Sequence, residues 1–236
     1  MSQLTYSGSR VESLEANQQS IDARRRTRHS GDGSLQRAVK RLLDVLLAGG
    51  GLVVFGPAMF FTALLIWQTR GPALYRQERI GINGRRFRCL KFRTMVLDSQ
   101  EKLAEHLASN EDAAREWKET HKLRDDPRVT KLGRFLRKSS IDELPQLINV
   151  LRGEMSIVGP RPIVQDEVEK YGEHFAAYTS VPPGITGLWQ ICGRSDIAYP
   201  ERVRLDVMYV ENWTLAGDLM IIFRTIPAVL RARGAT

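Results

Sequence analysis

The sequence has few cysteines and histidines, and neither type is spaced as a disulfide framework or a metal site would require. Its 236 residues include 2 cysteines and 4 histidines. Cys89 and Cys192 lie far apart, with no C-x-x-C pair and no histidine pair nearby. We therefore predict neither a disulfide nor a zinc site, and we interpret both cysteines as half-buried thiols in a reducing compartment. The histidines stand among charged residues or in the polar N-terminal stretch, and no chemistry is assigned to them.

Internal repeats and a signal-peptide pattern are also lacking. Residues 1–33 are polar, carry the basic cluster RRRTR at 24–28 and end in a Gly/Ser break, and no small-residue cleavage site precedes the apolar run that follows. This composition predicts a disordered, basic, cytosolic N-terminal arm.

Acidic residues are in the minority. The chain carries 35 Lys and Arg against 27 Asp and Glu, a formal net charge of +8. Such an excess indicates an anionic partner, which could be nucleic acid, an anionic membrane surface or a phosphorylated substrate. With 42% hydrophobic residues the chain is long enough for one compact domain with an appendage.

One long apolar run, residues 42–69, contains a single charged residue, Asp44. At about 1.5 Å per residue, a straight helix of this length could cross a hydrocarbon core of about 30 Å. Pro57 lies in the middle of the run and predicts a kink, and basic residues flank both ends, whereas a spanning helix concentrates them on one side. A re-entrant helix over residues 34–69, which enters one leaflet, bends at Pro57 and returns, fits these features better. A Pro-kinked spanning helix remains the alternative.

The remaining residues, 70–236, predict a cytosolic domain of short elements. Two extended stretches in residues 73–95 flank Asn83-Gly84, a dipeptide that favours a type I′ hairpin turn. Helices are expected over residues 98–122, 130–138, 145–153 and 218–234. Gly153 is expected to end the third of these helices, and the last is expected to lie at the membrane interface. The predicted fold class is α+β, predominantly helical with a small β-hairpin, in a monotopic membrane protein.

The stretch SSIDELPQ, residues 139–146, places two adjacent carboxylates, Asp142 and Glu143, inside a basic region. One interpretation is a capping box, in which Ser140 caps a helix and Glu143 returns the hydrogen bond, although Pro145 weakens that pattern. The functional interpretation is that adjacent carboxylates point in different directions, so that one can attack a substrate while the other holds a metal ion.

Several other motifs carry polar residues for which a purely structural role is the alternative. GPRP fixes the backbone on both sides of Arg161, and a stiffly presented guanidinium suits phosphate recognition. KFRTM supplies Lys91 as a further phosphate contact or a surface charge. VPPGITGLWQICGR is expected to form a loop that ends in Arg194. Asp206, in RLDVMYV, is either the partner of a nearby arginine or a metal ligand.

Taken in order, the Pro-containing membrane run, KFRTM, LRKSSIDELPQL, RGEMSIVGPRP, PPGITGLWQICGR and RLDVMYV resemble the bacterial sugar transferases, the monotopic phosphoglycosyl transferases. The resemblance covers residues 35–236 and implies a re-entrant membrane helix followed by a cytosolic catalytic domain over residues 70–236. It also implies that Asp142 is the nucleophile and that Glu143 helps to hold Mg²⁺. The family positions that contact phosphate or nucleotide correspond to four basic residues of this sequence, Lys91, Arg137, Arg161 and Arg194. A further active-site acid corresponds to Asp206.

The resemblance further implies a reaction and its partners. A UDP-sugar, either UDP-galactose or UDP-glucose, and undecaprenyl phosphate would give undecaprenyl-diphospho-sugar and UMP through a phospho-sugar aspartyl intermediate. This is the first membrane step of exopolysaccharide synthesis, on the cytoplasmic face of the bacterial inner membrane. The bilayer is a partner, nucleic acid is not, and a homo-oligomer stays open. The sequence does not identify the hexose.

Two other functions are consistent with parts of the sequence. In a sequential transferase Asp142 would only bind metal, and the lipid phosphate would attack directly. A non-enzymatic, membrane-anchored adaptor would use the basic hairpin and arm to bind nucleic acid or polysaccharide, but it leaves SSIDELPQ without a role.

Overall fold

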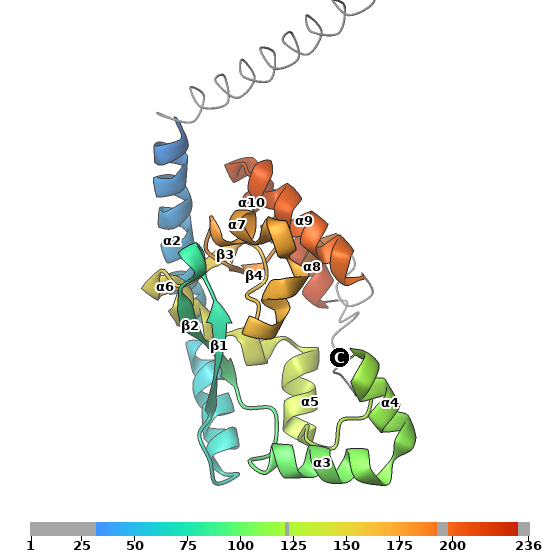
Figure 1. Ribbon diagram of the computed structural model, residues 1–236. Helices are drawn as coiled ribbons and strands as arrows, with labels where there is room; N and C mark the ends of the chain where they lie inside the picture. The colour runs from blue at the N-terminus through green and yellow to red at the C-terminus, as the bar shows by residue number, and fades with distance from the viewer. Residues whose placement is uncertain (1–31, 121–122, 193–197, 231–236) are drawn as a thin grey trace, which may run out of the picture. The chain divides into compact units, whose positions relative to one another are not determined.

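The computed structural model describes residues 32–120, 123–192 and 198–230, which form mainly helices with two small two-stranded sheets (Figure 1). The predicted helical α+β class with a small hairpin is thereby confirmed. The predicted N-terminal arm lies almost wholly outside the described residues. The chain divides into two compact units, Met1–Leu43 and Asp44–Thr236, and all contacts discussed below lie within the second.

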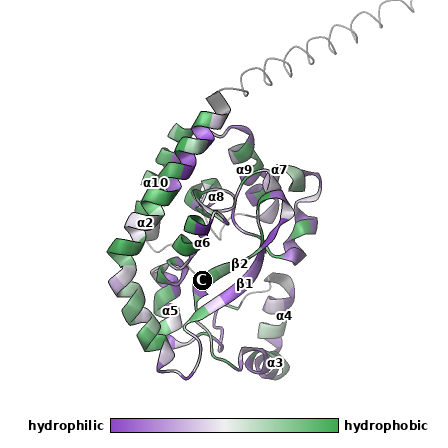
Figure 2. Ribbon diagram, turned by 90° about the vertical axis from the view of Figure 1, so that its left-hand side faces the viewer, coloured by the Kyte–Doolittle hydropathy of each residue, from purple (hydrophilic) through white to green (hydrophobic). Residues whose placement is uncertain are grey.

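Helix α2, Asp32–Trp67, has 36 residues, includes Pro57 and is the one described helix long and apolar enough to cross a membrane. Its most apolar window reaches a mean hydropathy of 1.9, and only 11% of that window is buried. Large apolar side chains such as Val53, Phe60 and Phe61 are exposed. Figure 2 shows the apolar colour along the helix. A core helix of a soluble protein would be mostly buried, so this exposure indicates association with a membrane.

One face of α2 packs against the rest of the second unit, both before and after Pro57. The Asp44 carboxylate is buried and accepts hydrogen bonds from Ser156 Oγ at 3.0 Å and from the Ile157 N–H at 2.9 Å. Beyond Pro57, Ile66 is 2% exposed and packs in a core cluster with Phe92 on strand β2. The single charge of the apolar run is therefore a polar anchor inside the protein.

Strands β1, Leu74–Ile80, and β2, Arg86–Phe92, form the predicted antiparallel hairpin. Asn83 and Gly84 have φ values of 54° and 71°, and the Arg85 N–H donates to the Ile82 carbonyl at 3.1 Å. Positive φ at both central positions is what a type I′ turn requires, so this prediction is confirmed.

The open edge of β2 is closed by one buried side chain, Asn149 of helix α6, Gln146–Arg152. The Leu90 N–H donates to Asn149 Oδ1 at 3.0 Å, and Asn149 Nδ2 donates to the Arg88 carbonyl at 2.9 Å. Gly153 ends the helix with a φ of 80°, as expected. Because Leu90 and Lys91 are neighbours, Asn149 also fixes the position of the strand that carries Lys91.

Replacing Asn149 with alanine is expected to lower the free energy of unfolding by about 2–4 kcal/mol, because two buried backbone groups of β2 lose their partners. Thermal unfolding of the detergent-purified protein measures this. The exposed Asn212, whose side chain donates to the Met208 carbonyl of the preceding helix, gives the matched control Asn212→Ala. Equal melting temperatures for the two variants would contradict the edge role.

The GPRP and PPGITG motifs lie side by side. Strand β3, Ser156–Val158, pairs in parallel with β4, Gly184–Thr186. A Cβ atom at Gly159 would lie 2.6 Å from the Pro182 carbonyl oxygen, and one at Gly184 would lie 2.1 Å from the Gly159 nitrogen. These glycines therefore permit a backbone contact that positions the following Arg161.

The remaining elements agree with the sequence in most places. Two helices lie within residues 98–122, and one helix lies near the C-terminus, as expected. The bounds of these and the other helices are α3 (Ser99–Ser109), α4 (Glu111–Thr120), α5 (Lys131–Lys138), α7 (Phe175–Thr179), α8 (Leu188–Cys192), α9 (Tyr199–Glu211) and α10 (Leu215–Leu230). Short 3₁₀ turns η1 to η4 span Ile82–Gly84, Ile141–Glu143, Gln165–Lys170 and Gly172–His174.

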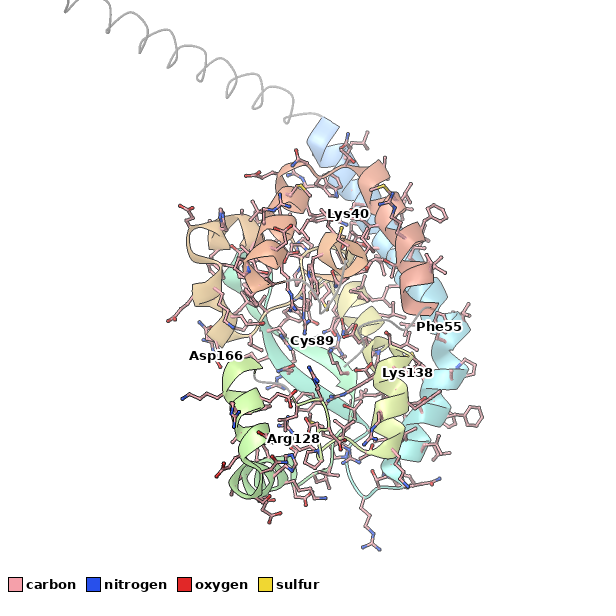
Figure 3. All side chains as sticks on the ribbon, turned by 90° about the vertical axis from the view of Figure 1, so that its right-hand side faces the viewer. Lys40, Phe55, Cys89, Arg128, Lys138 and Asp166 are labelled. Atoms are coloured by element: carbon pink, nitrogen blue, oxygen red, sulfur yellow. The ribbon has the colours of Figure 1, made fainter. Side chains whose placement is uncertain are left out.

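The burial expected for the two cysteines is wrong. Cys89, labelled in Figure 3, is 1% exposed. It lies on the same face of β2 as Phe87, and both belong to a core cluster with Val150 of α6. Cys192 is exposed at the end of α8. Both are free thiols, as predicted.

Candidate active site

The acid pair lies in a sharp connection between α5 and α6. Thr130 caps α5 by accepting a hydrogen bond from the Gly133 N–H at 2.8 Å. After α5 the chain turns at Ser140, whose φ is 58°, and enters the 3₁₀ turn Ile141–Glu143. The Ser140 side chain makes no capping hydrogen bond. The capping-box interpretation is therefore wrong, because the left-handed backbone at Ser140 does not allow that geometry and Glu143 is bound elsewhere.

The two carboxylates have different surroundings. Glu143 Oε1 accepts a hydrogen bond from Lys91 Nζ at 2.6 Å. Burial acts against ionisation of Glu143, but the charge and hydrogen bond of Lys91 outweigh it and lower the pKa of Glu143. Asp142 is 8% exposed. Burial, and then the neighbouring Glu143 charge, raise the pKa of Asp142 to about 6, although Lys91 and Arg137 oppose the shift.

Three of the predicted basic residues surround this pair. Lys91 comes from β2, and Arg137 comes from the last turn of α5, where its Nε donates to Thr94 Oγ1 at 3.0 Å. Burial lowers the pKa of Arg137, and the charge of Asp142 acts in the opposite direction. Arg161, from GPRP, is close enough for its charge to lower the pKa of Glu143. The site thus joins two buried or half-buried acids to three cations from three separate elements.

Asp206 lies close enough to Arg161 for the charge of that arginine to act on it. It is 1% exposed, and its Oδ2 accepts a hydrogen bond from the Tyr171 hydroxyl at 2.8 Å. Its Oδ1 has no hydrogen-bond partner among the described residues. Burial raises the pKa of Asp206 to about 7, against the Tyr171 hydrogen bond and the Arg161 charge. Arg161 therefore acts on Asp206 through its charge, and the hydrogen-bond partner of Asp206 is Tyr171 and not an arginine.

The pKa of Asp206 gives a pH-dependent prediction. Because the pKa is raised on folding, ionised Asp206 destabilises the protein, and its contribution to stability falls as the pH rises from about 4 to about 7. Asp206→Asn is expected to raise the free energy of unfolding at both pH values, and by on the order of 2 kcal/mol more at pH 8 than at pH 5, because the loss in wild type continues until the pH passes the folded pKa of about 7. Differential scanning fluorimetry of wild type and variant at both pH values tests this. The exposed Asp166 supplies the control Asp166→Asn, and a gain that is independent of pH would reject the prediction.

Arg194 lies outside the described residues. The segment before it differs from the expected loop, because residues Leu188–Cys192 form helix α8. Trp189 of this helix is 4% exposed, and the guanidinium carbons of Arg161 and Arg202 lie 5.7 Å and 5.0 Å from its ring centroid. Trp189 therefore packs against two arginines, one of which, Arg161, also acts through its charge on Glu143.

Sequence reasoning missed Arg79, Thr94, Tyr171 and Arg202. Arg79 is one of the basic residues that follow the apolar run in the sequence. It is 9% exposed, donates from Nη1 to the Pro162 carbonyl at 2.9 Å and thereby braces the GPRP segment. Nothing in the sequence separates Arg79 from its exposed basic neighbours. Thr94 belongs to KFRTM, so that motif contained the signal.

The described residues contain no group of three or more His, Cys, Asp or Glu side chains that could hold a metal ion. Mg²⁺ is commonly held by one or two carboxylates together with the phosphates of a substrate. The carboxylate oxygens of Asp142 and Glu143, next to cations suited to phosphate, fit this pattern. The residues present are therefore compatible with Mg²⁺ that arrives with a phosphorylated substrate.

These features are those of a phosphate-handling transferase, and comparison with known proteins places the chain in a family. The bacterial sugar transferase family matches residues 35–232, and the chain belongs to it. It is therefore an enzyme of the sugar-phosphate transferase type.

Three curated relatives are similar over most of this chain. The exopolysaccharide production protein ExoY of Rhizobium meliloti is 51% identical over 83% of this chain and 87% of its own length. The undecaprenyl-phosphate galactose phosphotransferase of Salmonella typhimurium is 48% identical over 84% of this chain and 42% of its own length. The UDP-glucose:undecaprenyl-phosphate glucose-1-phosphate transferase of Caulobacter vibrioides is 39% identical over 83% of this chain and 71% of its own length. This chain thus spans most of ExoY but less than half of the Salmonella protein.

Proposed function

We propose that this protein transfers hexose-1-phosphate from UDP-galactose or UDP-glucose to undecaprenyl phosphate and releases UMP, as the first membrane step of exopolysaccharide synthesis. The observation that carries the proposal is the pair Asp142 and Glu143 held among Lys91, Arg137 and Arg161. Relatives that share most of this chain are named for transfer of galactose or glucose phosphate to that lipid.

The proposed mechanism begins with the Asp142 carboxylate. One of its oxygens attacks the phosphorus that bears the sugar, the bond from that phosphorus to the UMP oxygen breaks, and UMP leaves with the bonding electrons. An aspartyl phosphosugar remains. A phosphate oxygen of the lipid then attacks the same phosphorus, and Asp142 leaves as a carboxylate. Lys91, Arg137 and Arg161 offset the repulsion between an anionic nucleophile and anionic substrates in both steps.

The partly desolvated state of Asp142 suits this role. Its raised pKa shows that its charge is poorly stabilised by the surrounding protein, so an ionised Asp142 is a stronger nucleophile than a solvated carboxylate. Glu143, with its pKa lowered and its position fixed by Lys91, would hold Mg²⁺. When bound, Mg²⁺ would neutralise charge on the diphosphate of the sugar nucleotide.

A re-entrant arrangement of α2 is part of the proposal. Asp44, Ala48 and Ile66 pack against the same unit on the two sides of Pro57, which has no N–H for the helical hydrogen bond. A helix that crossed the bilayer would carry one of these ends away from the cytosolic side. Placement of both ends at the cytoplasmic face would bring the acid pair to the depth of lipid phosphates.

UMP release is the assay that tests the function. Purified protein with Mg²⁺ is mixed with UDP-galactose or UDP-glucose, with and without undecaprenyl phosphate, and intact mass is recorded. With lipid, we expect sustained UMP release. Without lipid, we expect a burst of one UMP per protein, together with the addition of one hexose-phosphate to the intact mass of the protein. Release only with lipid would replace the covalent route with the sequential one. No release from either nucleotide, together with salt-sensitive binding of nucleic acid, would favour the adaptor.

A further inference from the structure

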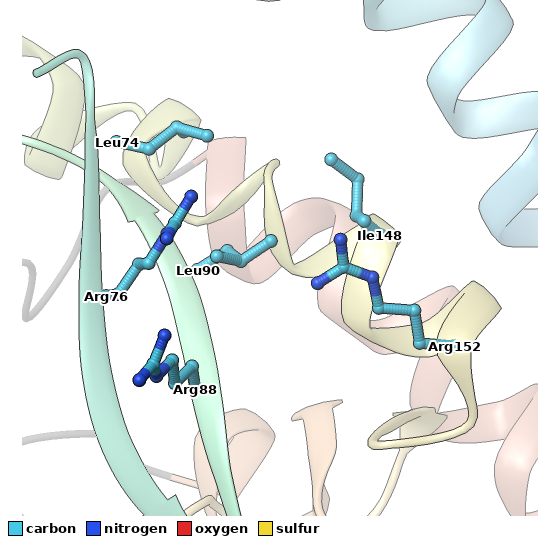
Figure 4. Close-up of a pocket in the computed structure, with 6 residues that line it drawn as sticks. All are labelled: Leu74, Arg76, Arg88, Leu90, Ile148 and Arg152. Carbon is cyan, nitrogen blue, oxygen red and sulfur yellow. The ribbon is translucent and has the colours of Figure 1, made fainter.

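A second basic site lies on the hairpin, apart from the acid pair. Three arginines and three aliphatic residues line a pocket of about 250 Å³ between β1, β2 and α6 (Figure 4); they are Leu74, Arg76, Arg88, Leu90, Ile148 and Arg152. Arg88 and Leu90 alternate along β2 with Cys89 and Lys91, so they lie on the opposite face of the strand. Lys91 reaches Glu143, and the pocket therefore faces away from the acid pair.

Two acids close to this pocket along the chain, Glu78 and Glu154, are hydrogen-bonded to residues outside it. Glu78, opposite Arg88 in the hairpin register, accepts a hydrogen bond from Arg86 at 2.9 Å. Glu154, just after α6, accepts from Asn149 Nδ2 at 2.6 Å. Within the ranges that the structure describes, no ion pair is formed by any of the three arginines. Arg76, Arg88 and Arg152 are all exposed, and three guanidinium groups around one pocket attract an anion into the space between them.

The shape and lining of the pocket indicate an amphiphilic anion. Figure 4 shows the side chains of Arg76 and Arg152 extending from β1 and α6 toward the space above Leu90. Leu74, Leu90 and Ile148 provide an apolar lining beside these cations. A phosphate joined to hydrocarbon satisfies both parts, whereas a free phosphate satisfies only the cations.

The pocket also lies next to the apolar helix. A Cβ atom at Gly51 of α2 would lie 3.1 Å from Leu147 Cδ1 of α6, so these helices touch there. Ile148, the next residue of α6, lines the pocket, and the neighbouring turn of α2 carries the exposed Val53 and Val54. Hydrocarbon that covers those side chains would therefore lie beside the pocket, so that an attached anionic group could reach the arginines.

We infer that the pocket lined by Arg76, Arg88 and Arg152 binds the phosphate headgroup of an acidic phospholipid of the bilayer. This lipid is distinct from the sugar-accepting lipid of the proposed reaction. It holds the hairpin, and with it the strand that carries Lys91, at the membrane surface.

Native mass spectrometry of the full chain in detergent tests the inference without any assay of activity. Phosphatidylglycerol, phosphatidylcholine and inorganic phosphate are titrated into wild type and into the triple variant Arg76→Gln, Arg88→Gln, Arg152→Gln. The control carries Arg85→Gln, Arg115→Gln and Arg124→Gln, which remove the same charge at exposed positions away from the pocket. Wild type and control are expected to bind phosphatidylglycerol in preference to the other two probes. The triple variant is expected to bind it at least about tenfold more weakly, since three cations near the headgroup are lost.

Three outcomes would overturn the inference. Equal losses in the triple variant and the control would show that only net charge matters. Equal binding of phosphatidylcholine would remove the role of the anionic headgroup. Displacement of phosphatidylglycerol by equimolar undecaprenyl phosphate would assign the pocket to the lipid substrate. A circular dichroism spectrum and melting temperature like those of wild type establish that the triple variant is folded.

Discussion

Replacing Asp142 with asparagine is expected to reduce sugar-phosphate transfer at least about 10³-fold, because an amide oxygen cannot form the acyl phosphate of the proposed mechanism. The intact-mass adduct should disappear together with UMP release. Membrane association should stay unchanged, because Asp142 lies in the turn between α5 and α6 and not on α2. Steady-state UMP release, measured at saturating UDP-sugar and lipid, gives the size of the loss.

Loss of activity through misfolding is distinguished by stability. Burial raises the pKa of Asp142 to about 6, so in metal-free buffer at pH 8 the ionised side chain destabilises the folded protein. The variant Asp142→Asn should therefore melt at the same or a higher temperature than wild type. The exposed Asp166 provides the control Asp166→Asn, which should keep full activity. Transfer above about one tenth of the wild-type rate by Asp142→Asn would reject the nucleophile assignment.

Replacing Glu143 with glutamine is expected to have the second largest effect, a loss of about 10²-fold at low Mg²⁺. Glu143 binds Lys91 at 2.6 Å, and the same carboxylate is the proposed Mg²⁺ ligand. The neutral amide would leave Lys91 without its ion-pair partner and would weaken the metal site. The Mg²⁺ concentration for half-maximal UMP release should therefore rise several-fold, and part of the activity should return at high Mg²⁺.

The matched control for this variant is Glu173→Gln, since the side chain of Glu173 is 90% exposed. Its Mg²⁺ titration should superimpose on that of wild type. If Glu143→Gln also leaves the titration midpoint unchanged, Glu143 acts only on Lys91 and is not a metal ligand. The UMP burst of Glu143→Gln in the absence of lipid reports on the first half-reaction alone. A burst that is slow but of normal size would show that Asp142 still becomes fully modified with hexose-phosphate, only more slowly.

The candidate site combines reactivity with a cost in stability. Asp142 and Asp206 both have their pKa raised by burial, and both lie near Arg161 or Arg137, whose charges partly compensate. Native proteins rarely bury carboxylates without full hydrogen bonding, and such groups concentrate at functional sites. The unpartnered Oδ1 of Asp206 is one such group among the described residues. This supports the place given to Asp206 in the proposed site.

Much of the local structure was determined by the sequence because it depends on neighbouring residues. Asn83-Gly84 accepts positive φ at low steric cost, so the hairpin turn follows from two residues. Gly153 likewise ends α6. The length and composition of α2 predicted an apolar helix, and the ordered motifs indicated the family that the comparison then showed. These features need no knowledge of which distant residues touch.

Only the tertiary structure decided which charges belong to the site. Arg76 and Arg79 are separated by two residues and are chemically identical, yet Arg79 is buried against Pro162 while Arg76 lines an exposed pocket. Asp44 became a buried anchor through contacts with residues more than a hundred positions away. Lys91 and Glu143 meet across 52 positions of sequence. Burial and pairing of a charge depend on the elements that pack around it, and those contacts do not follow from spacing along the chain.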